Sequence, residues 1–314
     1  MGKLAFLFPG QGSQAVGMGK ALLEHSAAAR AVFDEADDAL SEKLSQIILE
    51  GPEDELRRTA NTQPAILTVS VAATRLLELR GIRPGIVAGH SLGEYSAHVA
   101  AGTFSFADAV RVVRTRGRYM QDAVPVGTGA MAAVLGLGRD EVAAACEEAA
   151  DGEVVAPANL NAPGQVVIAG TVAAVQRAGE RARARGAKRV IPLPVSAPFH
   201  CALMQPAQDR LAPELRAMAV SAPRVPVVAN VDAEPKTDGA GAIEALVRQI
   251  SAPVRWEDVV GRLASAGVRA YVEVGPGTVL SGLVRKVHRD ARVASLETPA
   301  DLEAVERLMR DVQA

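Results

Sequence analysis

The sequence predicts an α/β fold in which a larger α/β domain carries a smaller inserted subdomain. Three observations support this prediction. Short apolar runs alternate with amphipathic helical stretches along most of the 314 residues. Hydrophobic residues make up 49% of the chain and aromatic residues only 3%, so Ala, Val and Leu must fill the core. Between Gly127 and Val195 the order becomes β-α-β-β-α-β, which is that of a ferredoxin-like split unit.

Turn residues and periodicity define the elements of the larger domain. Pro9-Gly10-Gln11-Gly12 ends the first strand, and Gly81 and Pro84 separate the longest helix from the strand that follows it. Gly275-Pro276-Gly277 ends the last strand, and Thr278 is expected to cap the next helix. We expect strands at 3–8, 86–88, 225–229 and 270–274, and helices at 20–40, 44–49, 63–79, 94–99, 106–123, 207–218, 254–266, 279–287 and 300–312.

The small subdomain is expected to span residues 126–196 and to interrupt a domain formed by residues 1–125 and 197–314. Proline-containing segments bracket it on both sides, and Thr171 is expected to cap its second helix. Its predicted elements are a strand at 130–137, a helix at 139–150, strands at 154–160 and 165–169, a helix at 171–185 and a strand at 188–193.

Charge and cysteine content argue against several classes of protein. The net charge of −2 gives no reason to expect nucleic acid as a partner. Cys146 and Cys201 are too few for a disulfide framework or a four-cysteine zinc site, and they fit a reducing compartment. The first strand is too short for a signal peptide, and no apolar run is long enough to span a membrane. We therefore expect a soluble cytoplasmic protein that binds neither nucleic acid nor a membrane and holds no metal.

The most informative motif is Gly89-His90-Ser91-Leu92-Gly93, which matches G-x-S-x-G. An apolar run precedes it and an amphipathic stretch follows, as in a nucleophile elbow. A serine on such a strand–turn–helix lies at a helix N-terminus, where backbone N–H groups and the helix dipole favour negative charge. This placement suits attack on a carbonyl and stabilisation of the resulting oxyanion. The alternative is an ordinary glycine-flanked turn.

His200 is the strongest candidate for the base that such a serine needs. It lies in a proline-punctuated loop where the chain leaves the small subdomain, a position that favours facing a cleft. The alternative is a turn histidine bonded to the backbone. No aspartate between Ser91 and His200 lies at the end of a clear strand. We therefore expect a Ser–His dyad in which a carbonyl oxygen orients the imidazole.

Three further residues are candidates for binding groups. The backbone N–H of Leu92, and that of Gln11 in the glycine-rich turn after the first strand, are suited to an oxyanion hole. A flexible β–α turn is the alternative for Gln11. Arg116 lies on an arginine-rich helix, where a solvated face is the default interpretation.

Six motifs, in order along the chain, carry a resemblance to a known family. They are Phe8-Pro9-Gly10-Gln11-Gly12-Ser13-Gln14, Gly89-His90-Ser91-Leu92-Gly93-Glu94-Tyr95, Arg114-Thr115-Arg116-Gly117, Asn161-Ala162-Pro163-Gly164-Gln165, Ala197-Pro198-Phe199-His200 and Glu273-Val274-Gly275-Pro276-Gly277. Nearly end to end, the chain resembles malonyl-CoA:acyl-carrier-protein transacylases. The resemblance implies an α/β-hydrolase-like large domain with a ferredoxin-like insert.

The resemblance also implies a role for individual residues. Ser91 would be the nucleophile and His200 its general base and later acid, with the N–H groups of Gln11 and Leu92 forming the oxyanion hole. Arg116 would bind the malonyl carboxylate, since a guanidinium fork matches a carboxylate with two parallel hydrogen bonds.

Two more residues take their roles from the resemblance. The backbone carbonyl of Gln249 would hold His200, which fits the missing aspartate. Phe199 would crowd a methyl branch on the acyl group, a preference worth about 1–3 kcal/mol.

The implied reaction is a ping-pong transfer in fatty acid biosynthesis. Malonyl moves from malonyl-CoA to Ser91, CoA leaves, and the phosphopantetheine thiol of acyl carrier protein takes the acyl group. The CoA thioester is a substrate, so no cofactor is expected. An esterase or thioesterase with water as acceptor, and a non-catalytic scaffold that binds carrier protein, are the alternatives. A discrete polyketide acyltransferase would share these motifs.

Overall fold

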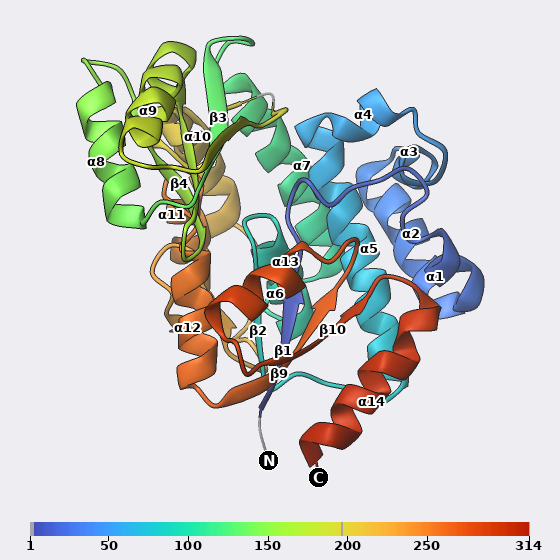
Figure 1. Ribbon diagram of the computed structural model, residues 1–314. Helices are drawn as coiled ribbons and strands as arrows, with labels where there is room; N and C mark the ends of the chain where they lie inside the picture. The colour runs from blue at the N-terminus through green and yellow to red at the C-terminus, as the bar shows by residue number, and fades with distance from the viewer. Residues whose placement is uncertain (1–2, 196, 314) are drawn as a thin grey trace.

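A computed structural model describes residues 3–195 and 197–313 and contains two β-sheets (Figure 1). The strands of the larger sheet are β1 (Lys3–Phe8), β2 (Ile86–Gly89), β7 (Val227–Val228), β8 (Pro235–Lys236), β9 (Val268–Val274) and β10 (Arg292–Leu296). Their order in the sheet is β10-β9-β1-β2-β7-β8. All neighbouring strands are parallel except β7 and β8. The carboxyl ends of the central strands β1 and β2 therefore meet at one edge, where open α/β sheets place their binding sites.

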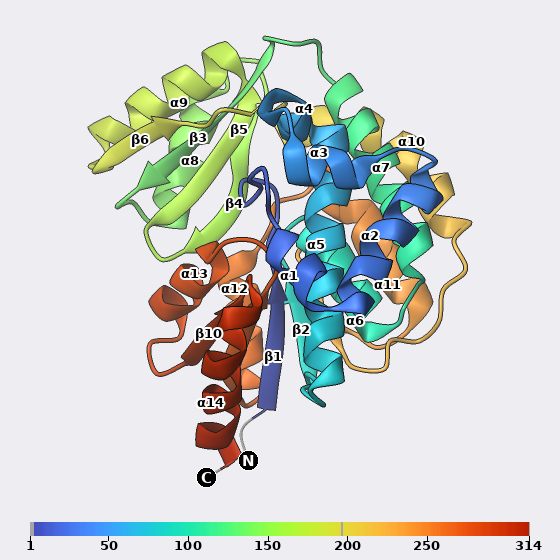
Figure 2. The same cartoon turned by 90° about the vertical axis from the view of Figure 1, so that its right-hand side faces the viewer.

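Helices cover both faces of this sheet (Figure 2). The helices of the large domain are α1 (Lys20–His25), α2 (Ala27–Leu40), α3 (Leu44–Glu50), α4 (Glu53–Arg57), α5 (Thr59–Leu79), α6 (Gly93–Ala101), α7 (Phe106–Asp122), α10 (Gln205–Arg216), α11 (Gly239–Gln249), α12 (Trp256–Ser265), α13 (Val279–Val287) and α14 (Leu302–Gln313). Within the described part of the chain, no helix has both the length and the apolar character needed to cross a bilayer.

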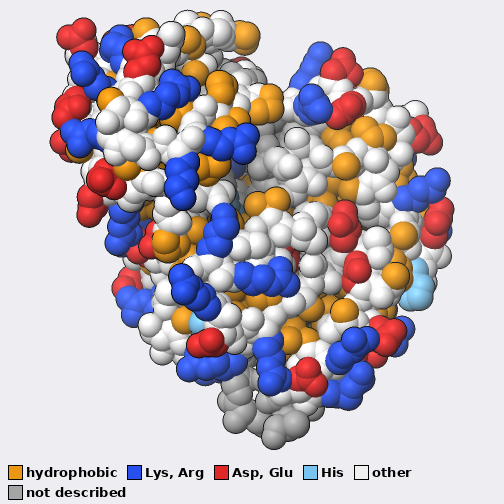
Figure 3. Space-filling model, viewed as in Figure 1, with side chains coloured by type: hydrophobic (Ala, Val, Ile, Leu, Met, Phe, Trp, Pro, Cys, Tyr) orange, Lys and Arg blue, Asp and Glu red, His pale blue; other side chains and the backbone are white. Residues whose placement is uncertain are grey.

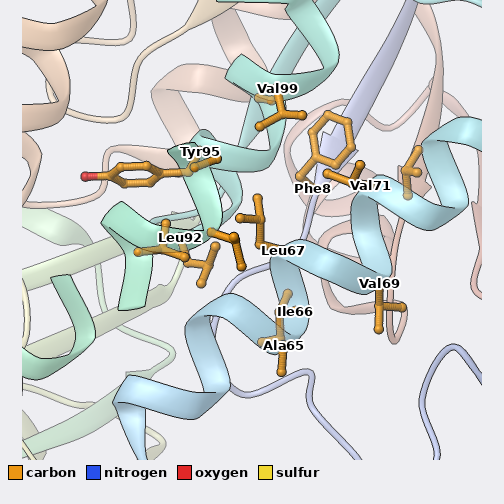
Figure 4. Close-up of a cluster of buried hydrophobic side chains, with 14 of the residues drawn as sticks. Phe8, Ala65, Ile66, Leu67, Val69, Val71, Leu92, Tyr95 and Val99 are labelled. Atoms are coloured by element: carbon orange, nitrogen blue, oxygen red, sulfur yellow. The ribbon is translucent and has the colours of Figure 1, made fainter. Parts of the chain in front are cut away.

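Strand β1 shows how alternation builds the two halves of the core. Phe6 and Phe8 point to the face covered by α5 and α6, whereas Ala5 and Leu7 point to the face covered by α12 and α13. Both faces of β1 are buried, which explains why its sequence is a continuous apolar run rather than an alternation of apolar and polar residues. In the close-up, Phe8 and Val99 lie together beside Val71 (Figure 4).

The small subdomain forms a separate antiparallel sheet at one end of the molecule (Figure 1). Its elements are β3 (Gly129–Leu135), α8 (Arg139–Ala149), β4 (Val155–Ala162), β5 (Gln165–Thr171), α9 (Val172–Ala184) and β6 (Arg189–Pro192). The strand order β4-β5-β3-β6 is that of a ferredoxin-like unit. Thr171 caps α9 as expected, because its side chain accepts from the backbone N–H of Ala174. The predicted fold class is confirmed, while the boundaries at 126 and 196 stay a prediction, and residue 196 lies outside the described residues.

Several elements differ from the sequence prediction. The helix expected at 20–40 is two helices, because Ser26 between α1 and α2 is extended. Thr278 occupies the N-cap position of α13 as predicted, but its side chain makes no capping hydrogen bond. The strand expected at 225–229 is reduced to two residues beside Pro226. Sequence reasoning missed α4, α11, β8 and β10, which are short or, for α11, begin with glycine-rich sequence of low helix propensity.

Candidate active site

A cavity of about 110 Å³ lies between the two sheets, and both domains contribute its walls. Figure 3 shows the molecule hollowed between the small subdomain and the helices of the large domain. The lining residues are Gln11, Gln63, His90, Ser91, Leu92, Arg116, Met120, Met131, Asn159, Leu193, Val195, Phe199 and His200. The structure therefore gathers into one cavity residues that are separated by almost 190 positions in the sequence.

Ser91 occupies the sharp turn between β2 and α6. Its φ of 53° lies in the left-handed region, which costs a non-glycine residue energy and exposes its hydroxyl. The flanking glycines permit this turn, because a Cβ on Gly89 would lie 1.9 Å from the carbonyl of Gly93. A Cβ on Gly93 would lie 2.0 Å from the carbonyl oxygen of Phe8. Both glycines of the motif are therefore required by close backbone contacts.

Gly89→Ala is expected to destabilise the fold by at least about 3 kcal/mol, because backbone atoms would have to move to admit the methyl group. The matched control is Gly261→Ala, in the interior of α12, where a Cβ would meet nothing within 4 Å. That control should be neutral or stabilising by about 0.5–1 kcal/mol. Urea unfolding of both variants measures the difference, and equal midpoints would contradict the steric argument.

Ser91 and His200, the two residues of the predicted dyad, lie within hydrogen-bond distance of each other. Ser91 Oγ lies 2.7 Å from His200 Nε2, and His200 Nδ1 lies 2.9 Å from the backbone carbonyl oxygen of Gln249. Burial, reinforced by the nearby Arg116 charge, lowers the pKa of His200 to about 3, so the ring is neutral at neutral pH. The carbonyl can only accept, so Nδ1 carries the proton and Nε2 accepts from the serine hydroxyl. The arrangement fits a nucleophile with its general base.

Arg116 projects from α7 into the cavity and is only 1% exposed, so the default expectation of a solvated face was wrong for this residue. Its Nη1 donates to Gln63 Oε1 at 2.7 Å and its Nη2 to Gln249 Oε1 at 2.9 Å. Nη2 also lies 3.2 Å from Ser91 Oγ. Since both amide partners are neutral, they hold the guanidinium beside the nucleophile without neutralising its charge. The Tyr95 ring, 5.3 Å from the guanidinium carbon, supports it from a third side.

The other predicted site residues also reach the cavity. Gln11, Leu92 and Phe199 line it, and Phe199 is 8% exposed. The Gln11 side chain donates to the Thr59 hydroxyl at 3.3 Å, which holds the turn after β1 against the start of α5. The oxyanion-hole role of the Gln11 and Leu92 N–H groups and the selectivity role of Phe199 stay predictions.

Sequence reasoning missed three polar residues that hold these groups in place. Asn230 accepts from the Ser91 N–H at 2.6 Å and donates to the Gly89 carbonyl at 2.7 Å. Glu94, on the first turn of α6, accepts from the Asn230 N–H at 2.9 Å. Gln63 binds Arg116. Only Asn230 left a usable signal, as a polar residue directly after an apolar strand.

The chain is similar over nearly its whole length to known proteins. A family model described as the acyl transferase domain matches residues 5–313. The malonyl CoA-acyl carrier protein transacylase of Salmonella typhimurium is 52% identical over 305 residues, covering 97% of this chain and 99% of that relative. The enzyme of the same name from Bacillus subtilis is 48% identical over 312 residues, covering 99% and 98%.

Solved structures show the same similarity. An acyl carrier protein S-malonyltransferase from Vibrio cholerae has a TM-score of 0.94 at 48% identity, covering 96% of this chain and 99% of that one. A malonyl-transacylase in complex with a type II PKS acyl-carrier protein has a TM-score of 0.95 at 45% identity, covering 97% and 99%.

Proposed function

Because this chain belongs to the malonyl-CoA:acyl-carrier-protein transacylase family, we propose that its reaction proceeds through a malonyl ester on Ser91. The enzyme transfers malonyl from malonyl-CoA to the thiol of acyl carrier protein, a step of fatty acid synthesis. The observation that carries the ester proposal is the position of Ser91 Oγ, which contacts both the base His200 and the cation Arg116.

In the loading half-reaction, neutral His200 takes the proton of the Ser91 hydroxyl through Nε2 as the oxygen attacks the thioester carbonyl. The N–H groups of Leu92 and Gln11 stabilise the oxyanion of the tetrahedral intermediate. Collapse of the intermediate breaks the C–S bond, and His200 returns the proton to the departing CoA thiolate. Ser91 then carries malonyl as an oxygen ester.

In the second half-reaction the phosphopantetheine thiol of acyl carrier protein enters the space that CoA vacated. His200 accepts the thiol proton, and the thiolate attacks the ester carbonyl. When the C–O bond breaks, the proton passes from His200 to Ser91, which restores the hydroxyl. The same residues thus serve both directions, as a reversible transfer requires.

Arg116 bears on which acyl group the site accepts. Its charge is held next to the nucleophile by neutral amides, so the site is suited to an acyl group that carries its own carboxylate. Phe199 lines the acyl cavity and would crowd a methyl branch on malonyl.

Cys146 and Cys201 are buried free thiols, which supports our assignment of the enzyme to the cytoplasm.

Intact-protein mass spectrometry after exposure to malonyl-CoA tests the proposal. We expect a stable mass increase of one malonyl group that disappears when phosphopantetheinylated acyl carrier protein is added, with malonyl appearing on the carrier. Rapid loss of the malonyl group to water without the carrier would favour the thioesterase alternative. An enzyme that transfers malonyl without ever acquiring the mass increase would exclude the covalent route.

A further inference from the structure

The side-chain amide of Gln249 lies between the carboxyl group of Glu94, which accepts hydrogen bonds, and the guanidinium of Arg116, which donates them. Its Nε2 donates to Glu94 Oε2 at 2.8 Å and to the Ser91 carbonyl oxygen at 2.9 Å. Its Oε1 accepts from Arg116 Nη2 at 2.9 Å. All four of these residues lie within one buried network, and Glu94 and Gln249 are completely inaccessible to solvent.

These partners allow the amide only one orientation. A guanidinium has donors and no acceptor, while the Ser91 carbonyl oxygen and Glu94 Oε2 are acceptors here; a proton on the Glu94 carboxyl group would be carried by Oε1, which has no partner, so Oε2 accepts in either charge state. If the Gln249 amide turned over, its NH₂ group would face Arg116 and its oxygen would face Glu94. Both contacts would then be repulsive, so Glu94 on one side fixes the acceptor that Arg116 receives on the other.

The same oxygen of Glu94 also binds the residue that holds the nucleophile elbow in place. Oε2 accepts from the backbone N–H of Asn230, whose side chain holds the backbone of Ser91 and Gly89. One atom therefore joins the segment that positions Ser91 to the segment that positions Arg116. In contrast, Glu94 Oε1 has no hydrogen-bond partner, so the carboxyl group acts through a single oxygen.

We propose that Glu94 is a positioning residue that sets the preference of the site for a carboxylated over a neutral acyl group, through the Gln249 amide that holds Arg116. The proposal rests on the proposed function, because it assumes that Arg116 receives the malonyl carboxylate. Glu94 itself does not touch the acyl group in this scheme.

The charge state of Glu94 gives the preference a pH dependence. Burial raises the pKa of Glu94 to about 7, opposed by the hydrogen bonds from Gln249 and Asn230. The charged and titratable groups that act on it are Arg116 on α7, which lowers the pKa, and Asp232 after β7, which raises it; the neighbouring Tyr95 on α6 also interacts with it. Above about pH 7 the carboxyl group is ionised and adds a negative charge behind Arg116, which disfavours a second carboxylate in the cavity. The preference for malonyl should therefore fall as the pH rises through neutrality.

The experiment compares loading of malonyl-CoA and acetyl-CoA by the wild type, Glu94→Ala, Glu94→Gln and the control Ser96→Ala. Ser96 is a suitable control because it is buried on the same helix and its hydroxyl has no partner. Glu94→Ala removes the acceptor and should lower the malonyl-to-acetyl ratio of kcat/KM about tenfold, as expected for the loss of a hydrogen bond to a charged group. Glu94→Gln keeps an acceptor oxygen, so its ratio should stay close to that of the neutral wild type and no longer vary between about pH 6 and about pH 8.5.

Each outcome bears on the proposal. A Glu94→Ala variant that loses malonyl and acetyl loading equally would show a merely structural role and overturn it. If that variant does not fold, the pH profile of Glu94→Gln decides, and a ratio that still falls with pH as in the wild type would overturn it as well. A wild type that forms no malonyl ester would instead refute the proposed function, which this comparison reports separately.

Discussion

Replacing Ser91 with alanine is expected to abolish malonyl loading, with a loss of at least about 10³-fold in transfer to acyl carrier protein. In the proposed mechanism the hydroxyl oxygen carries the acyl group between the two half-reactions. Among the residues that line the cavity, no second hydroxyl lies within reach of His200 Nε2. Loading is measured as the mass increase of the intact protein, and transfer as malonyl on the carrier.

The control for this variant is Ser96→Ala, five residues farther along the chain, which should load normally. Ser91→Ala should also melt close to the wild-type temperature, because the backbone strain at a φ of 53° is the same in both proteins and the hydroxyl that is removed is only half-buried. Residual transfer at more than a few per cent of the wild-type rate would mean that the carrier thiol attacks malonyl-CoA directly, and the ester route would be wrong.

Replacing Arg116 with alanine should lower kcat/KM for malonyl loading about 10²- to 10³-fold, while kcat/KM for acetyl loading stays the same or increases. Only malonyl presents a carboxylate to the guanidinium, which contacts Ser91 Oγ and is held by Gln63 and Gln249. Arg116→Lys should not restore the activity, since an ammonium cannot reproduce the planar fork. The measurement is kcat/KM for both acyl-CoA substrates.

Arg114→Ala provides a matched control for that experiment. Arg114 lies two residues earlier on α7, is 6% exposed, and pairs with Glu42 and Asn61 away from the cavity. Its loss should lower malonyl and acetyl loading by the same factor, through stability. An Arg116→Ala variant that behaved in the same way would assign Arg116 a structural role.

The parts of the site that sequence could predict are those encoded locally. The elbow at Ser91 follows from glycines two positions away on either side, and the exposure of His200 to a cavity follows from the prolines around it. A carbonyl partner for His200 was expected from the missing aspartate, and its assignment to Gln249 came from the family resemblance; the structure places the Gln249 carbonyl oxygen 2.9 Å from Nδ1.

The supporting network could not be predicted, because its hydrogen bonds join residues far apart in the chain. Gln249 Nε2 and the Ser91 carbonyl are separated by 158 positions, and Asn230 and Glu94 by 136. Their proximity depends on the strand order β1-β2-β7, which a single sequence does not reveal. The helix that presents Gln249 was missed for a different reason, since Gly239 and Gly241 weaken its helical signal.

The division of the cavity between two domains has a consequence for how the acyl-group selectivity of this enzyme changes under mutation. Ser91, His200, Arg116 and Gln249 all belong to the large domain and are joined to one another by hydrogen bonds. The ferredoxin-like subdomain contributes different groups, among them Met131 and Asn159, which border the acyl space. Mutations in the insert can therefore enlarge or narrow the room for an acyl chain while proton transfer stays intact. The residues that bound the acyl space in the insert are thus separate from the residues that transfer the proton in the large domain, so natural selection can act on acyl-group selectivity and on catalysis independently.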